Sequence, residues 1–205
     1  KVIGLFYKIP LIKYVGIEGM AYFLAANHIY IFLFVLSTSG LPVAVSIMVS
    51  EASVGNEKRD RGAAVFRAAL YMFLLIGAAG TLFMLFAAGK IAELINIGGA
   101  ARCICAIAPA VLLACVSGAY RGYFQGRQIM THTAVSQVIE AVGKLFLGLA
   151  GAMFALSRGY DSETVAAFAI AGITAGVGLA MLYLAVAKAL YDRKNNKEAE
   201  AILTC

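Results

Sequence analysis

Long stretches without a charged residue dominate this 205-residue chain. Four of them cover residues 19–50, 68–89, 103–120 and 164–187, and a fifth, 129–156, is interrupted only by Glu140 and Lys144. An α-helix needs roughly 20 apolar residues to cross the hydrocarbon core of a bilayer. The stretches are also too long and continuous for barrel strands of about ten residues. The predicted fold class is therefore an all-α, polytopic membrane helical bundle.

The composition supports this prediction, since the chain is 62% hydrophobic and 14% charged, whereas a soluble domain is about half apolar and a quarter charged. Residues 2–15, interrupted by Lys8, Pro10 and Lys13, read as the remainder of a further span whose beginning lies outside the chain. We therefore expect six spans, the first incomplete. Residues 1–190 would form a six-helix transmembrane lobe, and residues 191–205 a cytoplasmic linker or tail.

Lysine and arginine are concentrated in alternate loops, which predicts the orientation of the spans. The loops after the second, fourth and sixth spans carry Lys58, Arg59, Arg61, Arg67, Arg121, Arg127, Lys188, Arg193, Lys194 and Lys197. The opposite loops carry only Lys13, Lys90, Arg102 and Arg158. Cytoplasmic loops of membrane proteins are enriched in these residues. The net charge of +6 therefore indicates a cytoplasmic membrane face and no nucleic-acid partner.

Glu140 and Lys144 are the charged residues that most need an explanation. They are four positions apart on one predicted helix, so they share a face of it and can pair. A charge inside a bilayer is costly and usually faces the interior of a bundle. Two readings remain open: a structural ion pair, or the wall of a cavity that contacts a polar substrate. Gln137, one turn before Glu140, extends the same polar stripe, which favours the cavity.

Further polar residues lie on the first and second expected spans. Asn27 and His28 fall within the second span, where His28 either relays a proton or binds an anionic group, or serves only in packing. Lys1, Lys8 and Lys13 lie on the first span. They either extend to the membrane interfaces or form an inward surface that attracts anions.

Proline and glycine predict where the helices bend and pack. Pro42 and Pro109 lie inside expected spans, and because proline removes a backbone donor, we expect a kink at each. The segment GITAG, residues 172–176, repeats glycine at positions i and i+4, which allows a neighbouring helix to approach closely.

Residue patterns typical of catalysis are sparse. His28 and His132 lie on different segments, and no glycine-rich phosphate loop is present. Cys103, Cys105 and Cys115 fall in one apolar stretch and read as small packing residues. We therefore predict no catalytic residue, no metal site, no cofactor and no enzymatic activity. Coupling of a transport step to an ion gradient or to the membrane potential stays open.

Two segments, STSGLPVAVSIMVSEASVGNEKRDRGAAVFRAAL and GAYRGYFQGRQIMTHTAVSQVIEAVGKLFLG, resemble a known transporter family. They are similar to the MurJ and stage V sporulation protein B-like flippases of the multidrug/oligosaccharidyl-lipid/polysaccharide exporter superfamily. With KVIGLFYKIPLIKYVG at the start, the resemblance covers most of the chain. It implies a protein of two helical lobes, of which this chain is the N-terminal one, entered partway through its first helix.

The resemblance also implies roles for individual residues in a basic central cavity. It places Lys1, Lys8 and Lys13 on basic positions of the first helix. It matches Glu140 to the glutamate of the SQVIE motif, and Lys144 to the basic residue that follows one turn later.

The implied function is to flip a lipid-linked cell-wall or polysaccharide precursor across the bacterial cytoplasmic membrane by alternating access. Arg121 and Arg127 would mark the cytoplasmic mouth, near anionic lipid headgroups. The implied partners are membrane lipids, the lipid-linked oligosaccharide and the C-terminal lobe of the same protein. A multidrug exporter of the same superfamily, whose cavity should be acidic, and a non-transporting scaffold in envelope or spore assembly remain as alternatives.

Overall fold

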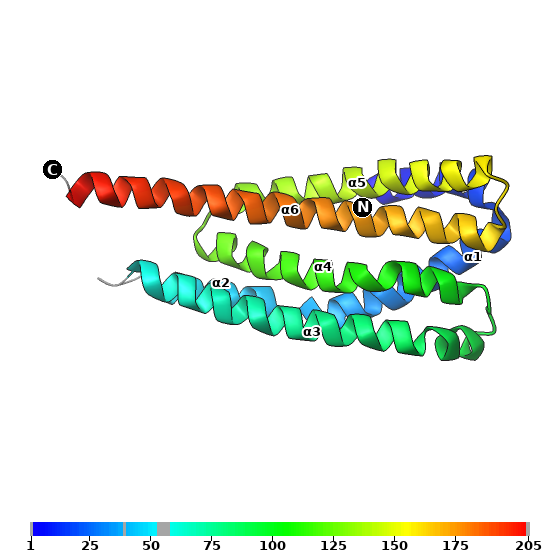
Figure 1. Ribbon diagram of the computed structural model, residues 1–205, viewed down its shortest axis with the longest axis horizontal. Helices are drawn as coiled ribbons and strands as arrows, with labels where there is room; N and C mark the ends of the chain where they lie inside the picture. The colour runs from blue at the N-terminus through cyan, green and yellow to red at the C-terminus, as the bar shows by residue number, and fades with distance from the viewer. Residues whose placement is uncertain (1, 39, 53–57, 204–205) are drawn as a thin grey trace.

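The computed structural model describes residues 2–38, 40–52 and 58–203, and the side chains of residues 11–35, 42–51 and 62–194. The described residues form helices and connecting turns, so the prediction of an all-α bundle is confirmed. Figure 1 shows an elongated bundle whose helices run along one axis. In chain order the helices are α1 (Val2–Thr38), α2 (Leu41–Ala52), α3 (Lys58–Leu94), α4 (Ala100–Gly126), α5 (Met130–Ser157) and α6 (Ser162–Leu203).

The chain reverses direction at sharp bends, and these bends define two ends of the bundle. Helix α1 consists of two helical segments that meet at Gly16, whose φ of 76° suits glycine. The bend within α1, the α3–α4 turn and the α5–α6 turn lie at one end, and the α4–α5 turn and the start of α3 lie at the other (Figure 1). The charge pattern assigned these same two sets of loops to opposite sides of a membrane, and the structure agrees with that assignment.

The second expected span, residues 19–50, is not one continuous helix. It is divided between the second part of α1 and the short helix α2. Pro42 accounts for the division, because its ring clashes with the carbonyl four residues earlier, on Thr38, where α1 ends. Pro42 instead occupies the first turn of α2, where its missing N–H is not needed.

Five helices of the described chain are long and apolar enough to cross a membrane: Leu11–Val35, Gly62–Leu94, Ala100–Gly126, Met130–Ser157 and Ser162–Lys194. Pro42–Glu51 is a shorter apolar helix. Five of the six expected spans thus correspond to long apolar helices of the described chain, with α2 continuing the path of the second. The first, residues 2–15, is the part of α1 before the bend at Gly16, and its crossing of a membrane stays a prediction. Helix α6 runs unbroken past residue 190, so the domain boundary expected there stays a prediction.

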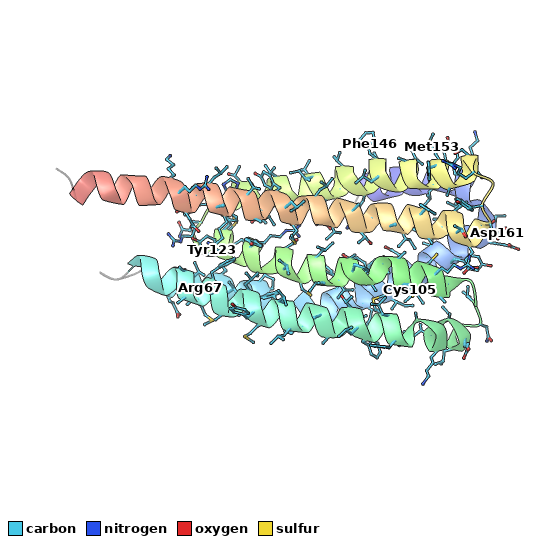
Figure 2. All side chains as sticks on the ribbon, in the orientation of Figure 1. Arg67, Cys105, Tyr123, Phe146, Met153 and Asp161 are labelled. Atoms are coloured by element: carbon cyan, nitrogen blue, oxygen red, sulfur yellow. The ribbon has the colours of Figure 1, made fainter. Side chains whose placement is uncertain are left out.

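Helix α4 lies at the centre of the packing, and its neighbours expose apolar residues on the outside. Ile104 and Phe124 of α4 are fully buried, as are Phe73 of α3 and Ile170 of α6. Figure 2 shows Phe146 and Met153 on the outer side of α5. An apolar outer surface of this kind suits contact with lipid tails. The chain is therefore a membrane protein.

Helices α5 and α6 pack backbone to backbone through glycine. A Cβ atom on Gly143 would lie 2.8 Å from the Cα atom of Gly176, and a Cβ on Gly176 would lie 2.6 Å from the amide nitrogen of Lys144. A Cβ on Gly172 would overlap the backbone of Leu147 and Gly148. The close approach predicted from the GITAG segment is confirmed.

A second glycine contact, which the sequence interpretation missed, joins α4 to α2. A Cβ atom on Gly122 would lie 2.8 Å from the carbonyl oxygen of Pro42, and one on Gly126 would lie 2.6 Å from that of Ser46. These glycines, with Gly118, are spaced by four residues along α4 and face one side of it. The short helix α2 therefore rests directly on the backbone of the central helix.

Candidate functional site

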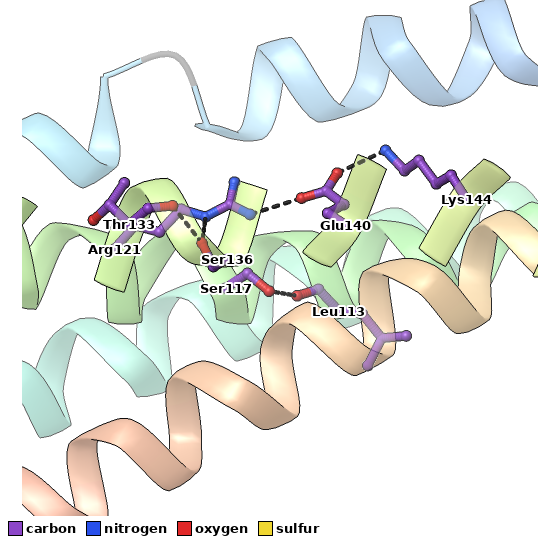
Figure 3. Close-up of polar contacts among 7 residues, drawn as sticks. All are labelled: Leu113, Ser117, Arg121, Thr133, Ser136, Glu140 and Lys144. Carbon is purple, nitrogen blue, oxygen red and sulfur yellow. Dashed lines mark hydrogen bonds and ion pairs between the residues drawn. The ribbon is translucent and has the colours of Figure 1, made fainter. Parts of the chain in front are cut away.

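The main polar cluster joins α4 to α5 and consists of Arg121, Glu140 and Lys144. The Lys144 ammonium donates to Oε1 of Glu140 at 2.6 Å, and Nη2 of Arg121 donates to Oε2 at 2.6 Å. Figure 3 shows the carboxylate lying between the two cations. The pairing of Glu140 with Lys144 follows the i,i+4 prediction. The contribution of Arg121 was not predicted as part of it.

The hydroxyl group of Ser136 holds Arg121 in place. Its Nε donates to Oγ of Ser136 at 3.1 Å, and the Ser136 hydroxyl donates to the carbonyl oxygen of Thr133 at 2.7 Å. Ser136, Glu140 and Lys144 follow one another at intervals of four residues, so they share one face of α5. The cluster therefore has a defined geometry, with one helix supplying the acceptors and another the guanidinium (Figure 3).

The cluster lies deep in the bundle and carries an excess of positive charge. Glu140 is ten residues after the start of α5, which places it about 15 Å along the helix. The exposed fractions of the side chains are 15% for Arg121, 19% for Glu140 and 30% for Lys144. One carboxylate cannot neutralise two cations, so a net charge of about +1 remains. A charge at this depth favours the approach of an anion.

Tyr30 of α1 lies next to this cluster. Its side chain is 5% exposed and interacts electrostatically with Glu140 and Arg121. The second part of α1 thus places an aromatic ring with a hydroxyl group near the cluster. Tyr30 was not among the predicted site residues, since nothing in its sequence position distinguishes it from a packing tyrosine.

The other predicted cavity residues of the described chain lie on α1 and α5. Gln137 and His28 are exposed, Asn27 is half-buried and Lys13 is exposed. Within the described part of the chain, no hydrogen bond or ion pair joins these four residues to Glu140. Lys1 lies outside the described residues, and so does the side chain of Lys8. A cavity role for all of these residues stays a prediction.

Pro109 lies inside α4 without ending it, and two threonines stabilise the backbone around it. The hydroxyl of Thr174 on α6 donates to the carbonyl oxygen of Ala106 at 2.9 Å. The hydroxyl of Thr81 on α3 donates to the carbonyl oxygen of Ala108 at 3.1 Å. Proline in a membrane helix is tolerated where neighbouring hydroxyls satisfy the loosened backbone. The helix therefore continues through Pro109 while it is held by both neighbours.

A second polar cluster, also missed in the sequence, gathers at the end of the bundle where α4 meets α5. The ammonium of Lys188 pairs with Asp192 at 2.5 Å and lies 4.5 Å from the ring centroid of Phe66 and 5.0 Å from that of Tyr123. Arg127, expected at the cytoplasmic mouth, lies beside the ring of Tyr123. Figure 2 places Tyr123 at this end and Asp161 at the opposite one.

Three of the four cysteines lie on α4. Cys103 and Cys115 are buried and Cys105 is exposed. Among the residues that the structure describes, no group of three or more His, Cys, Asp or Glu side chains is arranged to hold a metal ion.

Comparison with known proteins shows the family. The family model for polysaccharide biosynthesis proteins matches residues 1–203. The chain is 29% identical to stage V sporulation protein B of Bacillus subtilis over 91% of its own length, and 29% identical to lipid II flippase MurJ of the same organism over 90%. It is 28% identical over its whole length to YabM, a membrane protein of that organism described as uncharacterized. No solved structure matches the chain.

The matches cover most of this chain but little of each relative. The chain spans 36% of stage V sporulation protein B, 36% of MurJ and 38% of YabM. Together with the apolar helices, these relatives show a multi-pass bacterial membrane protein. Since the family model extends over nearly every residue, the chain belongs to the family of polysaccharide biosynthesis proteins.

Proposed function

We propose that the protein flips a lipid-linked cell-wall or polysaccharide precursor, of the undecaprenyl-linked type, across the cytoplasmic membrane by alternating access. The observation that carries the proposal is the Arg121–Glu140–Lys144 cluster, which holds excess positive charge deep in an apolar bundle. The polar head of such a precursor carries phosphate groups. Guanidinium and ammonium groups are the side chains that bind phosphate best. The name of the relative MurJ, lipid II flippase, supports the same class of substrate.

In this proposal Lys144 contacts the phosphate directly, because it is the most exposed member of the cluster. Glu140 holds Lys144 and Arg121 together and keeps their repulsion low until the phosphate arrives. Arg121 is fixed by Ser136 and sets the position of the carboxylate. The remainder of the protein would supply the second wall of the path, and the exposed face of α5 around Gln137 would face it.

The alternatives make different demands on this cluster. A multidrug exporter of the same superfamily would bind cationic compounds, and a site with a net charge of about +1 repels them. A non-transporting scaffold would need only the helix packing, so the charge excess would serve no purpose. An enzyme acting on a lipid-linked substrate would need an acid–base cluster at a membrane face, whereas this cluster lies within the span.

Translocation of labelled lipid II in vesicles tests the proposal, with the protein expressed from its complete gene. Lys144→Met removes the excess charge but leaves the pair of Arg121 with Glu140 intact. Loss of one charge-assisted contact, typically about 1.5–3 kcal/mol, predicts a fall in transport of about tenfold or more. Lys194→Met, which changes an exposed lysine of α6, is the matched control and should transport normally.

The outcomes separate the parts of the proposal. Transport no greater than in protein-free vesicles would reject flipping of lipid II. Normal transport by Lys144→Met would reject the role of the cluster and leave flipping intact. The combination of Glu140→Gln with Lys144→Met should impair transport, whereas a scaffold would tolerate it in a complementation assay. Imposing a membrane potential or an ion gradient on the same vesicles would test the coupling.

A further inference from the structure

Arg127 lies at the end of α4 on two aromatic rings. Its guanidinium carbon is 5.3 Å from the ring centroid of Tyr123 and 5.8 Å from that of Tyr191. The first ring belongs to α4 and the second to α6, so the guanidinium lies where these helices meet. A Cβ atom on Gly62 of α3 would lie 3.2 Å from Nη2, which means that glycine leaves the room this side chain occupies. Three helices therefore shape the position of Arg127.

The positive charge of Arg127 is not neutralised by the described side chains around it. Its Nε is buried and has no hydrogen-bond partner. Asp192, a carboxylate of the same polar cluster, already pairs with Lys188 at 2.5 Å and accepts from the Tyr123 hydroxyl at 3.5 Å. Lys188 and Asp192 compensate each other, and the charge of Arg127 is left over.

Stacking positions a guanidinium for a ligand without using up its donors. Contact with a ring uses the flat face of the group, and the N–H bonds in its plane remain available. Those donors form a planar fork that matches a phosphate group. The half-buried side chain keeps part of this fork accessible at the end of the bundle.

We propose that Arg127 is a binding site for the phosphate of an anionic membrane lipid at the cytoplasmic interface. The candidate spans of α4 and α5 end and begin at Gly126 and Met130, so Arg127 lies at the depth of lipid headgroups. Tyrosines are also enriched at this depth. The site is distinct from the Arg121–Glu140–Lys144 cluster, and it does not depend on the proposed transport.

A lipid fits the surroundings better than free phosphate does. Leu182, Val186 and Leu190 of α6 are 55%, 57% and 59% exposed and follow one another at intervals of four residues. This apolar stripe reaches the residue before Tyr191, so acyl chains can lie along α6 while the headgroup lies near Arg127. The negative charge of the cytoplasmic leaflet attracts such basic sites.

Native mass spectrometry of the protein, expressed from its complete gene, tests the site by titration with phosphatidylglycerol and, separately, with phosphatidylcholine. We expect preferential binding of phosphatidylglycerol, weakened about tenfold in Arg127→Gln because a charge-assisted contact is lost. Arg127→Lys keeps the charge but not the planar fork, so it should fall between the two. This second variant keeps the test decisive if Arg127→Gln folds poorly. Arg193→Gln, an exposed arginine on α6 at the same end, is the control.

Equal phosphatidylglycerol binding by the Arg127→Gln and Arg193→Gln variants would overturn the proposal, and so would wild-type affinity in Arg127→Lys. Inorganic phosphate forms the last arm of the experiment. Failure of millimolar phosphate to displace the lipid supports a lipid site. Displacement would show that the site takes free phosphate and would overturn the assignment of a lipid.

Discussion

Replacement of Glu140 by glutamine should destabilise the protein, because one carboxylate holds two cations. Both contacts, to Lys144 and to Arg121, are 2.6 Å long and lie among partly buried side chains. Removing one partner of a buried pair typically costs about 3–5 kcal/mol. Part of this cost is avoided because the Lys144 side chain can turn towards solvent, and because Arg121 keeps its bond to Ser136. We therefore expect a loss of about 3 kcal/mol, at the lower end of that range.

Two further variants give the prediction its internal control. Lys144→Met leaves the pair of Arg121 and Glu140 neutral and should cost less than about 1 kcal/mol. The combination of Glu140→Gln with Lys144→Met restores the original net charge of the cluster, since a single cation remains. It should recover about 1–2 kcal/mol relative to Glu140→Gln alone, because neighbouring charges couple strongly.

Unfolding of the purified protein by sodium dodecyl sulfate in mixed micelles, followed by circular dichroism, measures these differences. Glu93→Gln, at an exposed position of α3, is the reference and should lie within about 0.5 kcal/mol of the wild type. The reasoning is refuted if Glu140→Gln is as stable as this reference. It is also refuted if the double variant is less stable than Glu140→Gln, because the repulsion between the cations would then be unimportant.

Three other outcomes follow from the packing. Gly176→Val should force α5 and α6 apart and cost about 2 kcal/mol or more in the same unfolding assay, whereas Gly89→Ala, which has open space around it, should not. Thr174→Val should cost about 0.6–1.7 kcal/mol by removing a hydroxyl that donates to α4, and stability equal to the wild type would contradict that role. In a cysteine-free background, an impermeant thiol reagent should label Met130→Cys only from the cytoplasm and Tyr160→Cys only from outside, and labelling of both from one side would disprove the topology.

The helices could be predicted from the sequence because each depends on local properties. An uncharged run of about 20 residues has few stable alternatives to a membrane helix. The pairing of Glu140 with Lys144 depends only on the helical repeat, and the α5–α6 contact depends on the absence of side chains at Gly172 and Gly176. None of these features requires knowledge of how distant segments meet.

The parts that the sequence did not predict depend on contacts between helices. Arg121 reaches Glu140 only because α4 crosses α5 at the level of Ser136. The spacing of residues along the chain does not predict where two helices cross. The aromatic contacts of Arg127 combine residues of α4 and α6 that are 64 positions apart. The division of the second span was also missed, although Pro42 gives the signal for it, because a kink was expected where the helix in fact ends.

The segment GAYRGYFQG (residues 118–126) shows how one stretch of α4 serves two neighbours. Its glycines, spaced by four, present bare backbone to α2, while Arg121, between two of them, reaches α5. A side chain at Gly122 would push α2 away and leave the charge cluster untouched, since none of the three charged residues belongs to α2. The same nine residues of α4 therefore provide the packing surface for α2 on one face and the charged contact with α5 on another. Residues 118–126 therefore determine two helix contacts at once. The contact of Arg121 with α5 explains why a charged residue lies in this part of a hydrophobic bundle.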